Sequence, residues 1–141
     1  MKQVFADTAY WIALTNPFDQ HHAAAVEASS SLGQVRLITT DAVLTEFLNA
    51  LADSGVNIRA LAIRTVETIL NNPMVKVLPQ SRASFNSAFA LYKARPDKGY
   101  SLTDCLSMTV MRKHRLSLVL TSDRHFEQEG FVALMLTRPR R

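Results

Sequence analysis

The stretch KQVFADTAYWIAL, residues 2–14, decides the fold. Its first five residues form a short apolar run around Val4 and Phe5, which is typical of a buried β-strand. The run ends at Asp7, and we expect Tyr10 and Trp11 to pack beneath a first helix that follows. In parallel α/β sheets, ligands bind beyond the carboxyl ends of the strands. An acid directly after a strand is therefore a candidate for function.

Short apolar runs and helical patterns alternate along the rest of the chain. The runs are rich in Val, Ile, Leu and Phe and predict four more strands, at residues 35–39, 74–78, 117–121 and 131–136. Apolar residues at helical spacing predict further helices at residues 22–32, 42–52, 58–70, 84–93 and 102–113. Strands that alternate with helices long enough to be crossovers predict a parallel sheet with helices on both faces.

The composition is that of one folded domain. The chain has 141 residues, of which 48% are hydrophobic and 20% charged, so we expect residues 1–141 to share a single core. Cys105 is the one cysteine, which leaves no internal disulfide and no paired cysteines for zinc. Asp7 interrupts the N-terminal apolar run, and no stretch is long enough to span a bilayer. We expect a soluble, cytoplasmic protein.

The net charge of +4 is unevenly distributed. Residues 1–75 contain four Lys and Arg against seven acids, whereas residues 76–141 contain twelve against five. A basic half is a mild indication of a polyanionic partner such as RNA.

Three cations, Lys93, Arg95 and Lys98, precede Asp104 and could contact phosphates near the site. The alternative is a solvated loop without function. The basic residues 138–141 are another candidate contact for RNA.

Four acids occupy comparable places relative to the predicted strands. Asp7 and Asp123 directly follow strands, Glu46 lies in the helix after the second strand, and Asp104 opens the helix at 102–113. Each has a structural alternative, since Asp7 and Asp123 suit helix N-caps, Ser101 and Asp104 match a capping box, and Glu46 could be solvated. Their strongly apolar surroundings favour a shared site, because unpaired carboxylates rarely lie that close to a core.

Carboxylates gathered in one place repel each other. Two of them about 4 Å apart cost on the order of 4 kcal/mol at an effective dielectric constant near 20. No Lys or Arg is adjacent in sequence to Asp7, Glu46 or Asp104. A divalent cation would relieve this repulsion, and all-oxygen ligands suit Mg²⁺ or Mn²⁺. Such a site can polarise a phosphate and activate water.

Four segments in order resemble the motifs of the PIN-domain family. An apolar strand that ends in Asp-Thr resembles its opening motif, and the others resemble its second, third and fourth motifs; they are VFADTAYWIAL (4–14), TTDAVLTEFLN (39–49), SLTDC (101–105) and TSDRHF (121–126). Each motif alone is weak, but four in the family's order and approximate spacing, over nearly the whole chain, are specific.

The resemblance implies a three-layer α/β/α sandwich with a five-stranded, mostly parallel sheet. It also implies Mg²⁺- or Mn²⁺-dependent cleavage of RNA by a metal-activated water, with Asp7, Glu46, Asp104 and Asp123 as the catalytic and metal-binding residues. Thr8 and Thr121 would be supporting hydroxyls. Many small members are VapC-like toxins that an antitoxin neutralises. The helix at 58–70 has more apolar positions than one buried face needs, so we also expect a homodimer.

Two alternatives remain open. A receiver-like or haloacid-dehalogenase-like phosphotransfer domain also gathers acids at strand ends, but Asp7-Thr8-Ala9 lacks the D-x-D of that phosphatase class. The other alternative is a degenerate PIN module that only binds nucleic acid or a protein partner. The presence of all four acids argues against it.

Overall fold

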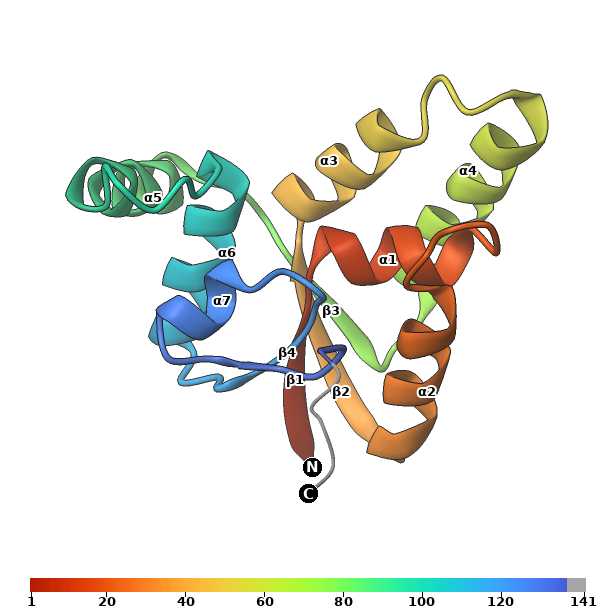
Figure 1. Cartoon of the computed structure of the whole chain (residues 1–141), viewed down its shortest axis with the longest axis horizontal. Helices are drawn as coiled ribbons and strands as arrows, with labels where there is room; N and C mark the ends of the chain where they lie inside the picture. The colour runs from red at the N-terminus through yellow and green to blue at the C-terminus, as the bar shows by residue number, and fades with distance from the viewer. Residues whose placement is uncertain (137–141) are drawn as a thin grey trace.

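A computed structural model, in which residues 1–136 are described, shows one five-stranded sheet with helices on both faces (Figure 1). The strand order is β3-β2-β1-β4-β5, and all four pairings are parallel. The strands are β1 (Lys2–Ala6), β2 (Val35–Thr40), β3 (Val75–Leu78), β4 (Leu118–Leu120) and β5 (Val132–Ala133). The predicted α/β sandwich with a five-stranded parallel sheet is confirmed.

The helices form the two outer layers. They are α1 (Thr8–Thr15), α2 (His22–Leu32), α3 (Asp41–Ala50), α4 (Val56–Asn71), α5 (Arg82–Ala94), α6 (Leu102–Lys113) and α7 (His125–Gln128). In Figure 1, α1, α2 and α4 lie on one side of the sheet and α5, α6 and α7 on the other, while α3 stands above the carboxyl ends of the strands. Among the described residues, no helix has the length and apolar character needed to cross a membrane.

The central strand β1 is the most buried part of the sheet. Val4, Phe5 and Ala6 are fully buried, as a strand covered on both faces requires. Phe5 is in register with Ile38 of β2 and Val119 of β4. The carboxyl ends of β1, β2 and β4 therefore lie side by side, and the segments that leave them start from one end of the sheet.

Buried polar contacts fix α1 at that end. The Trp11 indole Nε1 donates to Thr39 Oγ1 (3.5 Å), and Thr39 Oγ1 donates to the carbonyl of Ala6 (2.9 Å). Tyr10 and Trp11 are both buried, and their rings meet edge to face. This agrees with the expected packing of the two aromatic residues beneath the first helix. It joins α1, β2 and β1 directly behind Asp7.

Two elements differ from the sequence prediction. The predicted strand at 131–136 is reduced to the two residues of β5, because only Leu118 and Val119 of β4 pair with it. The short helix α7 was not predicted, since four residues are too few to show an apolar period. This helix begins two residues after Asp123, so it belongs to the surroundings of the candidate site.

Candidate active site

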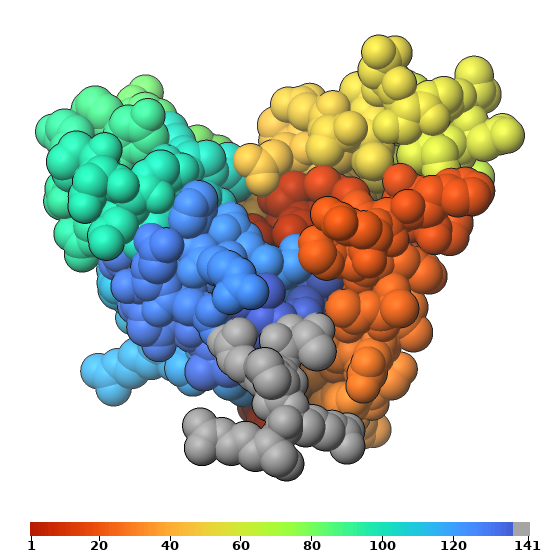
Figure 2. Space-filling model, viewed as in Figure 1, coloured from red at the N-terminus to blue at the C-terminus, as the bar shows by residue number. Residues whose placement is uncertain are grey.

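The surface of the molecule is hollowed at the carboxyl end of the sheet. Figure 2 shows the surface hollowed between the α5 and α6 region on one side and α3 on the other, with α1 at its floor. Asp7 lies at the end of β1, Asp104 in the first turn of α6, and Asp123 between β4 and α7. These three acids come together, as their electrostatic interactions show.

Asp7 is the most deeply buried of the acids, with 4% of its surface exposed. It occupies the N-cap position of α1, but its side chain makes no capping bond. Its Oδ2 instead accepts a hydrogen bond from Thr121 Oγ1 (2.8 Å). The pKa of Asp7 is raised to about 7, chiefly by burial and also by the nearby Asp104 and Asp123, against the lowering effect of the Thr121 bond. The capping interpretation of Asp7 thus holds for its position and not for its bonds.

Thr121 joins two of the acids. The residue is fully buried, and its Oγ1 donates to Asp7 and accepts from the backbone N–H of Asp123 (3.0 Å). One hydroxyl therefore fixes the Asp7 carboxylate and the start of the loop that carries Asp123. The Thr121 hydroxyl can therefore hold Asp7 and Asp123 in fixed positions relative to each other.

Asp104 forms the capping box that the sequence offered as its structural alternative. The Ser101 Oγ accepts from the Asp104 backbone N–H (3.0 Å), and Asp104 Oδ2 accepts from the Ser101 N–H (3.1 Å), which completes a capping box. Burial raises the pKa of Asp104, and Asp123 raises it further, while the Ser101 and His125 bonds lower it. The capping box holds the carboxylate at the hollow, so the structural and functional interpretations are compatible.

Asp123 faces Asp104 across a histidine that the sequence analysis did not select. His125 Nδ1 lies 3.4 Å from Asp104 Oδ2 and 3.3 Å from Asp123 Oδ1. Asp123 Oδ1 also accepts from the backbone N–H of His125 (2.9 Å). Asp104, Asp123 and His125 offer ligand atoms that all lie within 4.8 Å of one another. The only feature of the sequence that could have indicated this role of His125 is its position two residues after Asp123 in TSDRHF.

Glu46 lines a pocket whose lining includes none of the other three acids. It is half-buried on α3, and this pocket is also lined by Thr45, Asn49, Gln80 and, from the first turn of α6, Leu102 and Thr103. The Thr40 side chain accepts from the Val43 N–H (3.1 Å) and so fixes the start of α3. Of the four predicted acids, the structure thus brings together Asp7, Asp104 and Asp123.

The donor set suits a hard divalent cation. Within residues 1–136, no Lys or Arg forms an ion pair with Asp7, Asp104 or Asp123. In the same part of the chain, Thr8 Oγ1 and Ser107 Oγ are the buried side-chain atoms without a hydrogen-bond partner. Thr8 adjoins Asp7, so an unpaired buried hydroxyl lies beside the most strongly perturbed carboxylate. Crowded carboxylates and an unpaired hydroxyl fit Mg²⁺ or Mn²⁺ and its bound waters.

The three cations proposed as phosphate contacts differ in their surroundings. Lys93 and Lys98 are exposed, and Lys93 Nζ lies 4.7 Å from the centre of the Phe89 ring. Arg95 pairs with Glu129 (Nε to Oε2, 3.0 Å). Residues 138–141, the other basic segment considered, lie outside the described residues.

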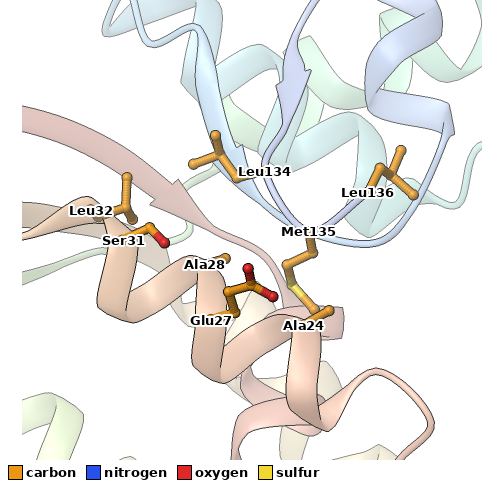
Figure 3. Close-up of a pocket in the computed structure, with 8 residues that line it drawn as sticks. All are labelled: Ala24, Glu27, Ala28, Ser31, Leu32, Leu134, Met135 and Leu136. Atoms are coloured by element: carbon orange, nitrogen blue, oxygen red, sulfur yellow. The ribbon is translucent and has the colours of Figure 1, made fainter. Parts of the chain in front are cut away.

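A second pocket has a mostly apolar lining. It separates α2 from residues 134–136 and is drawn in Figure 3; its described lining is Ala24, Glu27, Ala28, Ser31, Leu32, Leu134, Met135 and Leu136. Among these residues, Glu27 is the one titratable group. A mostly apolar lining with one carboxylate lacks the groups for phosphodiester chemistry, so the candidate active site is the hollow at the strand ends.

Comparison with known proteins places these residues in a family. The family model described as the PIN domain matches residues 4–131. VapC20 of Mycobacterium tuberculosis, from strains CDC 1551 / Oshkosh and ATCC 25618 / H37Rv, is described as a 23S rRNA-specific endonuclease. It is 29% identical over 132 residues, which cover 92% of this chain and 95% of the relative.

A comparison with solved structures also finds VapC20. The crystal structure of M. tuberculosis VapC20, described as a sarcin–ricin loop cleaving toxin, superposes with a TM-score of 0.83 at 26% identity. The superposition covers 92% of this chain and 96% of the VapC20 chain. The likeness therefore extends over the whole sheet and its helices.

Proposed function

Because this chain belongs to the PIN domain family, we propose that it is a metal-dependent endoribonuclease whose catalytic residues are Asp7, Glu46, Asp104 and Asp123. The observation that carries the proposal is the convergence of Asp7, Asp104 and Asp123 in one hollow, where Thr121 bonds two of them and no Lys or Arg pairs with any of the three within residues 1–136. Structural acids are normally paired or exposed, whereas this arrangement leaves negative charge for a cation to balance.

Each residue has a proposed task that follows from its position. Asp7 and Asp104, which are held by Thr121 and by the Ser101 capping box, would be the fixed metal ligands, and Asp123 would complete the set from its loop. Mg²⁺ or Mn²⁺, when bound there, would polarise the scissile phosphate and activate a water. Glu46, which lines a pocket between α3 and the first turn of α6, would orient that water or a second ligand. Thr8 and Thr121 are proposed as supporting hydroxyls.

An acidic site needs cations nearby to admit a polyanion. Lys93, Arg95 and Lys98 lie at the end of α5 and in the connection to α6. We propose that they contact the RNA backbone, with the two lysines the more available because Glu129 engages the Arg95 guanidinium. RNA affinity that comes from such phosphate contacts falls as the salt concentration rises.

The relatives support a finer proposal on substrate and partners. VapC20 is described as cleaving the sarcin–ricin loop of 23S rRNA, so an RNA hairpin with that loop is the first substrate to test. We propose that this chain is the toxin of a VapC-like pair, acts in the cytoplasm, is neutralised by an antitoxin protein and forms a homodimer. We further propose that residues 1–141 are a single nuclease domain, which the match over residues 4–131 supports.

The proposal is tested by cleavage of a labelled sarcin–ricin hairpin and of an unrelated hairpin of equal length. We expect cleavage in Mg²⁺ or Mn²⁺, none in EDTA, and recovery when Mn²⁺ is added back. Cleavage at an equal rate after exhaustive dialysis against EDTA would contradict metal dependence. Binding without cleavage in every metal would instead favour a degenerate PIN module that only holds RNA.

The phosphotransfer alternative loses its support. The sheet order β3-β2-β1-β4-β5 differs from the 2-1-3-4-5 order of receiver-like domains. The phosphatase class is disfavoured by the missing D-x-D after β1, where Thr8 and Ala9 follow Asp7.

A further inference from the structure

The Glu129 carboxylate lies outside the proposed metal site and accepts hydrogen bonds from four donor atoms. Its Oε2 accepts from Tyr100 Oη (2.7 Å) and Arg95 Nε (3.0 Å), and its Oε1 accepts from Arg112 Nη2 (2.8 Å) and Arg95 Nη2 (3.4 Å). The Glu129 side chain is 4% exposed, whereas those of Arg95 and Arg112 are 37% and 45% exposed. We call these four residues the Glu129 cluster.

The cluster connects the two segments that carry the acids. Arg95 and Tyr100 belong to the connection that enters α6 just before Asp104, and Arg112 lies in the last turn of α6. Glu129 directly follows α7. Arg112 Nη2 also donates to the backbone carbonyl of Glu129 (3.1 Å). Both ends of α6 are thereby tied to the end of α7 through one carboxylate.

The cluster reaches the metal site through an aromatic contact. The Tyr100 ring is buried and meets the His125 ring edge to face, with 5.2 Å between the ring centres. The Tyr100 hydroxyl is the group that Glu129 holds. His125 Nδ1 in turn lies between Asp104 Oδ2 and Asp123 Oδ1. Glu129, Tyr100 and His125 therefore form a continuous chain of contacts that ends on two of the four acids.

We propose that Glu129 and Tyr100 are positioning residues for the metal site, which set the separation of Asp104 and Asp123 by holding α6 against α7 and the Tyr100 ring against His125. The inference rests on the proposed function, since it concerns ligands of the proposed metal. Residues that orient metal ligands typically change metal affinity or activity 10- to 100-fold when they are replaced. Their loss should act on metal binding and turnover.

The test measures Mn²⁺ binding without RNA, by the loss of the electron paramagnetic resonance signal of free Mn²⁺ on titration with protein. Glu129→Gln removes the charge that holds both arginines, and we expect the Mn²⁺ dissociation constant to rise about tenfold. Tyr100→Phe keeps the ring against His125 and removes only the bond to Glu129, so we expect a smaller rise of about threefold. Glu67→Gln, the same chemical change on the exposed side of α4, is the matched control and should bind Mn²⁺ like the wild type.

A second readout separates positioning from a general loss of structure. In RNA cleavage at saturating Mn²⁺, we expect a lower kcat for both Glu129 cluster variants and an unchanged KM for Tyr100→Phe, which leaves the Arg95–Glu129 pair in place. Wild-type Mn²⁺ affinity in both the Glu129→Gln and Tyr100→Phe variants would overturn the inference while the proposed function stands. If Glu129→Gln does not fold, wild-type affinity in Tyr100→Phe alone overturns it. A wild-type protein that binds no Mn²⁺ would overturn the proposed function itself and this inference with it.

Discussion

At the scale of single residues, Asp7 is subject to opposing effects. Burial and two neighbouring acids raise its pKa to about 7, although Thr121 donates a hydrogen bond that stabilises the ionised form. Its pKa in the unfolded chain is near 3.8. Because the folded-state pKa is the higher one, Asp7 contributes stability at low pH that is lost as the pH rises through about 7. A bound cation would remove this penalty.

We predict that Asp7→Asn lowers RNA cleavage by orders of magnitude and stabilises the metal-free protein. The variant keeps the size of the side chain and an oxygen for Thr121 Oγ1, but it removes one charge from the cluster. In EDTA at pH 8, we expect its free energy of unfolding to exceed that of the wild type by about 1 kcal/mol or more, a few degrees in Tm. The difference should shrink as the pH falls toward 5. Thermal melts at both pH values, with a cleavage assay alongside, measure it.

If Asp7 were only a helix N-cap, the same substitution would have a different result. An N-cap Asp changed to Asn costs almost nothing in stability or activity. A variant that melts several degrees lower at pH 8 and still cuts RNA normally would show that the proposed carboxylate cluster does not exist.

Thr121 offers a matched pair of substitutions. We predict that Thr121→Val reduces cleavage about 10- to 100-fold and the free energy of unfolding by about 1–3 kcal/mol, because Asp7 and the Asp123 N–H lose a shared partner inside the protein. Thr121→Ser retains the hydroxyl and should keep most of the activity. Equal activity in the two variants would mean that the hydroxyl does not support the site.

The sequence predicted the acids at this scale better than their neighbours. A carboxylate at the end of an apolar strand is visible as a pattern, and the motif order selected Asp7, Glu46, Asp104 and Asp123, of which the structure brings together Asp7, Asp104 and Asp123. His125 and Glu129 were not selected, because their roles depend on how α7 packs against α6. Four residues of helix give no periodic signal from which that packing could be predicted.

At the scale of elements, two helices on the same side of the sheet begin with capping boxes, and only one of them carries a proposed catalytic residue. Ser101 caps α6 together with Asp104, and Ser81 caps α5 together with Ser84. We predict that Ser101→Ala and Ser81→Ala each lower the free energy of unfolding by about 1 kcal/mol. Ser101→Ala should also reduce cleavage, because the first turn of α6 holds Asp104, whereas Ser81→Ala should leave cleavage unchanged.

Denaturant unfolding measures the free energy of unfolding of the two variants, and single-turnover kinetics measure their RNA cleavage. An equal effect of both substitutions on cleavage would indicate that stability alone limits activity. No effect of either would show that the N-terminus of α6 does not determine the position of Asp104.

The element boundaries show which physical signals a sequence carries. β1 was predicted at its observed bounds, because its apolar residues 4–6 are fully buried in the centre of the sheet. β5 was overestimated, since the apolar residues 131–136 are buried largely outside the strand ladder. An apolar run indicates that a segment is buried, but it does not indicate whether its backbone pairs with a strand. The sequence therefore predicted the layers of the fold, and the length of an outer strand depended on its partner.

At the scale of the whole molecule, the charge and the apolar surface lie on different elements. Asp7, Asp104 and Asp123 meet at the strand ends, and the proposed RNA contacts Lys93, Arg95 and Lys98 lie at the end of α5 and in the connection to α6. On α4, Val56, Ile63 and Leu70 are 84%, 48% and 60% exposed. They are seven residues apart and so share one face of the helix, while Ala62 and Ile69 face the core. The excess apolar positions expected from the sequence are thus on the surface.

We predict that this α4 face, defined by Val56, Ile63 and Leu70, lies in a two-fold dimer interface. An isologous contact needs a self-complementary patch, and a helix that pairs with its own copy about a two-fold axis provides one. Light scattering should report a dimer at micromolar concentration, and the double variant Ile63→Asp with Leu70→Asp should be monomeric. Phe18→Asp, which changes an 88% exposed apolar residue outside α4, should remain dimeric. A wild-type monomer at high micromolar concentration would contradict dimerisation, and a dimer that survives the double change would place the interface on another face.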